Sequence, residues 1–101
     1  MNPKNLKDLI EYQEGAVVSK EILKTDSGTV TVFAFDAGQG LSEHRAPHEA
    51  LITLIEGEAE ITISGTKHAL SEGQVIILPA NQPHAVAASQ KFKMLLVMLK
   101  G

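Results

Sequence analysis

Turn-forming residues recur at short intervals along most of this chain and divide it into short extended segments. Glycine, proline, serine and acidic residues cluster at 26–28, 56–58, 64–65, 71–73 and 79–83. Between these clusters lie alternating or apolar runs, such as 29–32 and 59–63. Several short strands at close spacing, with glycine or proline turns, are typical of an all-β sandwich or barrel. The sequence therefore predicts an all-β fold, a small antiparallel β-barrel or jelly-roll sandwich.

The N-terminal segment follows a different pattern. Asn2 and Pro3 are suited to the cap and the first position of a helix. Leu6, Leu9 and Ile10 follow at helical spacing and form one apolar stripe. We therefore expect residues 1–101 to form a single domain, with a short helical segment at 1–14 and the β-barrel at 16–99.

Composition argues against several classes of partner. The net charge of −3 and the four aromatic residues offer little to a phosphate backbone or to stacked bases, so we expect no nucleic-acid partner. The longest apolar run, at 94–99, is far shorter than the ~20 residues that span a bilayer. The N-terminus lacks the apolar stretch of a secretory signal. We expect no membrane partner and a cytoplasmic location.

Two strands lack the alternation that a half-exposed sheet produces. Residues 75–78 and 94–99 are continuously apolar, so both faces of these strands favour burial. The barrel core covers one face only. The N-terminal helix or a second subunit would cover the other face, and our working hypothesis is a homodimer.

Two segments share a frame of glycine, proline and histidine at fixed spacing. The frame consists of Gly38, His44 and Gly57 in the first segment and of Gly73, Pro79 and His84 in the second. This frame resembles the paired motifs of the cupin superfamily, in its small single-domain, conserved-barrel (RmlC-like) form. The resemblance covers residues 38 to 88 and implies a cupin barrel with its site at the centre.

The resemblance also implies positions for metal ligands. The cupin pattern places three histidines and one glutamate around a divalent transition metal such as Fe, Mn, Ni or Zn. Here His44 and His84 occupy ligand positions, whereas Ala46 replaces the second histidine and Ala50 replaces the glutamate. Zinc sites normally use three or four protein ligands, so two histidines alone would hold an ion weakly.

His48 is the residue that would complete this ligand set. On a regular strand it would have the same parity as His44 and point inward, and Pro47 would bend the chain toward the site. One hypothesis is thus a metal site of His44, His48 and His84. The alternative is a polar pocket without metal, in which His44 and His84 bond to each other or to water.

The site residues leave three kinds of function open. The first is a small-molecule-binding cupin without catalysis, whose pocket is lined by Ala46, Ala50, Ile52 and Leu54. The second is a metal-dependent enzyme, of the dioxygenase or isomerase type, that uses the three histidines. The third is a barrel retained for dimerisation or partner binding.

Overall fold

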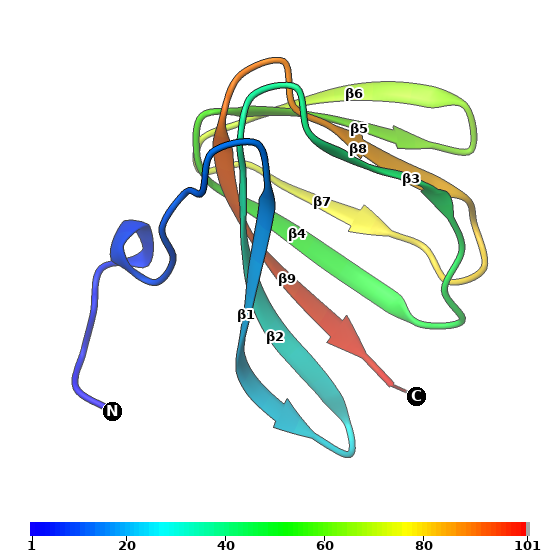
Figure 1. The fold of residues 1–101 in the computed structure, drawn as a ribbon. Coiled ribbons are helices and arrows are strands. Elements are labelled where there is room, and N and C mark those ends of the chain that lie inside the picture. The colour runs from blue at the N-terminus through cyan, green and yellow to red at the C-terminus, as the bar shows by residue number, and fades with distance from the viewer. Residues whose placement is uncertain (101) are drawn as a thin grey trace.

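The computed structural model describes residues 1–100, which form two facing antiparallel sheets preceded by an N-terminal segment (Figure 1). The large sheet has the order β1-β2-β9-β4-β7 and the small sheet the order β3-β8-β5-β6. The strands are β1 (Val17–Thr25), β2 (Gly28–Phe35), β3 (Gly40–His44), β4 (Glu49–Glu56), β5 (Glu58–Ile63), β6 (Thr66–Ser71), β7 (Val75–Leu78), β8 (His84–Ala87) and β9 (Phe92–Leu99). The prediction of a small antiparallel β fold is confirmed.

The core lies between the two sheets and is built from alternate residues of each strand. Ile52 and Leu54 of β4 face Ile61 of β5 across this space, and each is at most 1% exposed. Phe35 and Phe92, paired across β2 and β9, stack with ring centroids 4.5 Å apart. The turns predicted from the sequence fall between the strands, and Gly38, Gly57 and Gly73 all adopt positive φ.

Gly57 combines a left-handed backbone with a close approach of the β9 strand. Its φ is +84°, and an added Cβ would lie 2.6 Å from the Lys91 carbonyl oxygen and 2.9 Å from the Phe92 Cβ. Gly73 has nearly the same φ, +83°, with open space around it. These two glycines therefore separate the effect of backbone strain from the effect of crowding.

We expect Gly57→Ala to lower the free energy of unfolding by about 2–3 kcal/mol and Gly73→Ala by about 1 kcal/mol, because only Gly57 adds a steric clash to the cost of the left-handed conformation. Urea unfolding of both variants measures the difference. Equal losses would contradict the close approach at Gly57.

The N-terminal helical segment is much shorter than the predicted 1–14. Only a 3₁₀ turn, η1 (Leu6–Asp8), forms, and its cap is Asn5. A helix has a costly nucleus, and tertiary contacts decide whether so short a segment becomes helical. Here Leu9 and Ile10 pack instead against Val32 and other residues on the outer face of the large sheet. Figure 1 shows this segment outside the strands, away from the small sheet.

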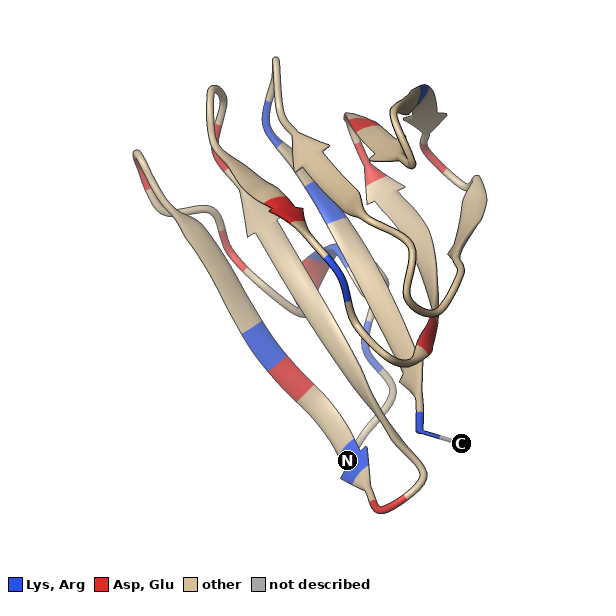
Figure 2. Cartoon of the chain, turned by 90° about the vertical axis from the view of Figure 1, so that its right-hand side faces the viewer, with Lys and Arg blue, Asp and Glu red and all other residues tan. Residues whose placement is uncertain are grey.

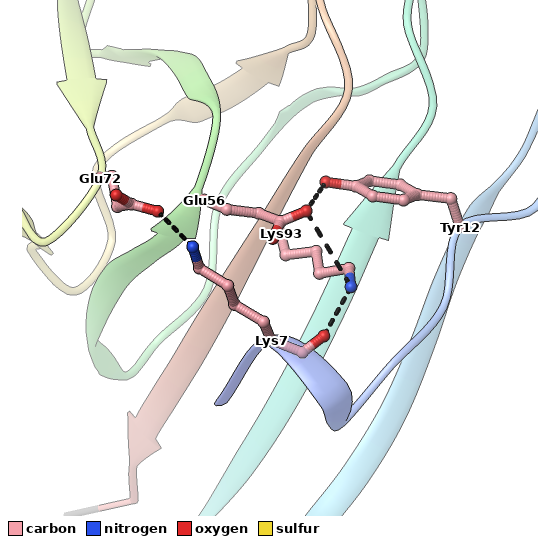
Figure 3. A network of polar contacts seen from close by, with 5 residues as sticks. All are labelled: Lys7, Tyr12, Glu56, Glu72 and Lys93. Carbon is pink, nitrogen blue, oxygen red and sulfur yellow. Dashed lines mark hydrogen bonds and ion pairs between the residues drawn. The ribbon is translucent and has the colours of Figure 1, made fainter. Parts of the chain in front are cut away.

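A polar network also fastens the N-terminal segment to the outer face of the large sheet (Figure 3). Lys93, only 5% exposed, donates a 2.6 Å hydrogen bond to the Lys7 carbonyl and lies 4.0 Å from the Glu56 carboxylate. Tyr12 donates a 2.6 Å hydrogen bond to the same carboxylate. An exposed ion pair between Lys7 and Glu72 extends the network.

Candidate functional site: a histidine pair

A β-bulge brings His44 and His84 together. Leu41 of β3 pairs with Val86 of β8, and on regular strands Glu43 would then stand opposite His84. The register shifts between Leu41 and His44, so that His44 takes that place. Bulges commonly re-aim a side chain beside a functional site, and this one exchanges a carboxylate for an imidazole.

The two imidazoles are in direct contact. Their Nε2 atoms are 3.0 Å apart, and their rings meet edge to face at 73° with centroids 4.3 Å apart. His84 is 8% exposed, whereas His44 is exposed to solvent. The pair thus has a buried member and a member that a solute can reach.

The neighbouring carbonyl groups determine how the protons are distributed. The Nδ1 atom of His44 lies 2.8 Å from the Ser42 carbonyl oxygen, so this nitrogen carries a proton and donates it. In the neutral ring the Nε2 atom of His44 is then an acceptor, and His84 Nε2 donates to it. The Nδ1 atom of His84 faces the Gln82 carbonyl at a longer distance, 3.3 Å, consistent with this arrangement.

The environment disfavours a second positive charge at the pair. Burial lowers the pKa of His84, and repulsion from a charged His44 lowers this pKa further, while the hydrogen bond to the Gln82 carbonyl acts in the opposite direction. A neutral imidazole is the form that binds a metal ion and the form that accepts a hydrogen bond. Burial therefore favours, for His84, the form that can do either.

Two loops at this end of the barrel are tied together and fix the position of His84. The Asn81 amide donates to the Ala46 carbonyl at 2.7 Å, and Asn81 adopts a φ of 66°, which asparagine tolerates. The Ser64 amide donates to the Pro83 carbonyl at 2.8 Å. The chain just before β8 is thus anchored on both sides.

The structure brings His44 and His84 together but does not bring His48 to them. The prediction for His48 assumes a regular strand that continues past His44, but β3 ends at His44 and β4 begins at Glu49 in the opposite sheet. His48 lies in the bend between them, where strand parity does not apply. Within residues 1–100, no three histidine or acidic side chains are grouped so as to share a metal ion.

The other predicted site residues differ in environment. Ala46 and Ala50 are half-buried, Ala46 in the loop after β3 and Ala50 packed against the core from β4. Ile52 and Leu54 are each 1% exposed and belong to the core. The inner face of β4 therefore changes from small and partly open at Ala50 to fully packed within two residues.

The donor set fits two ligands of a metal ion. Both Nδ1 atoms face backbone carbonyls, an arrangement typical of metal-bound histidines, and both Nε2 atoms face each other. Two nitrogens that bind one ion at ~2.1 Å and at right angles are about 3.0 Å apart, the separation seen here. Ala46 and Ala50 offer no further ligand, so the remaining positions would go to water or to a bound molecule.

Comparison with known proteins identifies the family. The family model described as "Cupin domain" matches residues 31–99. The chain belongs to the cupin family. A cupin superfamily protein from Desulfitobacterium hafniense is 33% identical, with a TM-score of 0.94, over 99% of this chain and 92% of that one. A Cupin 2 conserved barrel domain protein from Leptotrichia buccalis is 40% identical, with a TM-score of 0.92, over 96% of this chain and 47% of that one.

More distant similarity extends to an enzyme but concerns the fold alone. The DMSP lyase DddQ from Ruegeria pomeroyi is 23% identical, with a TM-score of 0.77, over 83% of this cupin and 47% of the lyase. A separate search of curated protein sequences found no match to this cupin. Within the described residues, no helix has the length and hydrophobicity of a membrane span.

Proposed function

We propose that this cupin binds a small molecule at the His44–His84 pair. The supporting observation is the convergence of a buried and an exposed imidazole, with Nε2 atoms 3.0 Å apart. A ligand oxygen that replaces one imidazole as hydrogen-bond partner would be recognised there, and we expect the rest of the ligand to lie along the predicted pocket residues Ala46 and Ala50. The proposed role is binding and does not require a catalysed reaction.

The expected result is stabilisation of the protein by its ligand. In a thermal-shift screen of small carboxylic acids, sugars and phenols, a ligand at 100 times its Kd adds about 2.7 kcal/mol, or about 10–20 °C for a domain of this size. His44→Ala should abolish the shift because His44 is the accessible member of the pair. His68→Ala, an exposed histidine on β6, is the matched control. A screen without any shift would contradict the proposal.

The second candidate is a metal-dependent enzyme, favoured by the fit of the two Nε2 atoms to one ion. In that case His44 and His84 would hold Fe, Mn, Ni or Zn, and the metal would act as a Lewis acid toward a bound substrate. Titration of chelator-treated protein with each metal tests this candidate. Loss of binding in His44→Ala with retention in His48→Ala supports a two-histidine site, whereas loss in both supports the three-histidine site.

We also propose that the protein is a homodimer. Support comes from the strands that are apolar on both faces. Val75 and Ile77 of β7 point away from the core and are 56% and 58% exposed in the single chain. Removal of such side chains from water is favourable at roughly 25 cal/mol per Å² of apolar surface.

A further inference from the structure

The hydrogen-bonding groups of the histidine pair are not equivalent. The Ser42 carbonyl oxygen, 2.8 Å from Nδ1 of His44, holds the proton of this ring on Nδ1. The Nε2 atom of His44 therefore has a lone pair and no hydrogen, and Nε2 of His84 supplies the single hydrogen between the two rings. A ligand group that enters between the rings must donate to His44 and accept from His84.

Within residues 1–100, neither imidazole has a hydrogen bond or an ion pair to a charged side chain. Arg45, the residue after His44, donates instead to the Asn81 carbonyl at 3.4 Å. The Glu49 carboxylate accepts from the Ala80 amide at 3.2 Å. Because burial of an unpaired charge is costly, a carboxylate at the pair would lose part of its hydration without a cation to replace it.

The inner faces of the strands around the pair are apolar. Ile63 of β5 pairs with His84 on the side away from His44. Ala50 and Leu78 pair across β4 and β7, at the far ends of the two loops that lead to the pair, and all three apolar residues pack in the core cluster. Figure 2 shows the charged residues mainly in loops and near strand ends, with long uncharged stretches along the strands. A ligand with an apolar body and one polar group at the pair suits these surroundings.

We infer that the histidine pair selects ligands with a neutral hydroxyl group, phenolic or aliphatic, over carboxylates and ethers. This inference rests on the proposed function and names the class of its ligand. A hydroxyl group both donates and accepts, so its hydrogen goes to His44 Nε2 while its oxygen accepts the hydrogen of His84 Nε2. A carboxylate or an ether only accepts, and either one leaves the His44 lone pair without a donor.

The exposure of His44 allows the oxygen to enter. Two hydrogen bonds of about 2.8 Å that meet at a tetrahedral oxygen hold the two nitrogens roughly 4.6 Å apart. The Nε2 atoms are 3.0 Å apart here, so one ring must move by roughly 1.6 Å. His84 is 8% exposed, whereas His44 is exposed and can turn toward solvent about its side-chain bonds. His84 is therefore the fixed donor and His44 the acceptor that moves.

Matched ligands test this selection. Phenol, anisole and benzoate share an aromatic ring, and cyclohexanol, methoxycyclohexane and cyclohexanecarboxylate form the aliphatic set. Calorimetric titration of the full chain at about pH 8, with a chelator present, keeps phenol neutral and metal ions away from the pair. We expect phenol or cyclohexanol to bind at least about tenfold more tightly than the ether and the carboxylate of its set, the ratio given by one hydrogen bond of about 1.4 kcal/mol. The set that responds identifies the ligand as phenolic or aliphatic.

A substitution that reverses the polarity of His44 separates selection from folding. His44→Lys replaces an exposed acceptor by a cation that only donates. This variant should therefore bind the carboxylate of the responding set at least about tenfold more tightly than the hydroxyl compound. His68→Lys, at an exposed position on β6, is the control and should keep the preference for the hydroxyl.

The results that would overturn this selection differ from those that would remove the site. Equal binding of hydroxyl, ether and carboxylate, lost in His44→Ala, keeps the small-molecule site and overturns the selection. A preference for the hydroxyl that persists in His44→Lys overturns the selection as well. Absence of binding by all six compounds also overturns it, and the wider thermal-shift screen then decides the proposed function separately.

Discussion

Phe92→Ala is expected to lower the free energy of unfolding by about 3–5 kcal/mol, the range for removal of a large aromatic side chain from a core. Phe92 is 0% exposed, and its ring stacks on Phe35 at a centroid distance of 4.5 Å and an angle of 15°. Its neighbours belong to both sheets, so little relaxation can fill the cavity. Since small domains have a total stability of about 5–15 kcal/mol, this one change removes a large part of it.

Phe33→Ala is the matched control. Phe33 lies on the same strand as Phe35, is only partly buried, and meets the Phe35 ring at 6.0 Å in a tilted geometry. We expect a loss of about 1–2 kcal/mol there. Urea unfolding at one fixed protein concentration compares the two variants, because the proposed dimerisation would make stability depend on concentration. Similar losses would show that the stacked pair does not anchor the core.

The fold could be predicted from local features because turn chemistry is local. Gly57 and Gly73 adopt positive φ in turns that the sequence predicts, and Asn81 does so in the turn at 79–83. The N-terminal segment could not be predicted in this way. Leu9 and Ile10 need only an apolar surface, and the outer face of the large sheet supplies it without a helix.

The candidate site could be predicted in part. The cupin frame identified His44 and His84, and the structure places them in contact. The prediction that His48 points into the site was wrong. Strand parity applies only along an unbroken strand, and the chain passes from the small sheet to the large sheet between His44 and Glu49. The sequence also does not predict the bulge before His44, because Ser42 and Glu43 are ordinary strand residues and no glycine or proline marks it. Sequence alone thus indicates which residues meet more reliably than how they meet.

Glu56→Gln is expected to lower the free energy of unfolding by about 2–3 kcal/mol, somewhat less than the 3–5 kcal/mol typical of breaking a fully buried ion pair. Lys93 is 5% exposed, and the Glu56 carboxylate, 4.0 Å away, is the acidic partner the structure gives it. The same carboxylate accepts the Tyr12 hydrogen bond. Glutamine keeps an acceptor for Tyr12 but removes the negative charge, so Lys93 remains buried beside a neutral group.

Lys93→Met separates the ion pair from the packing around it. Methionine fills a similar volume without a charge, and replacement of buried charges by apolar groups is often neutral, so we expect a change within about 1 kcal/mol. The double variant E56Q/K93M should be more stable than Glu56→Gln alone, because it no longer buries an unpaired charge. Additive losses across this double-mutant cycle would show that Glu56 and Lys93 do not interact.

Tyr12 gives the same network a dependence on pH, and Tyr12→Phe should remove it. Burial raises the pKa of the Tyr12 hydroxyl, and the hydrogen bond to Glu56 and its negative charge raise this pKa further. The unfolded chain loses this proton near the usual value of about 10, whereas the folded protein retains it to higher pH. The stabilisation is therefore fully present below pH ~10 and is lost as the pH rises above it. The free energy of unfolding should thus fall more steeply above pH ~10 in the unsubstituted protein than in Tyr12→Phe, and equal slopes would exclude Tyr12 as the titrating group.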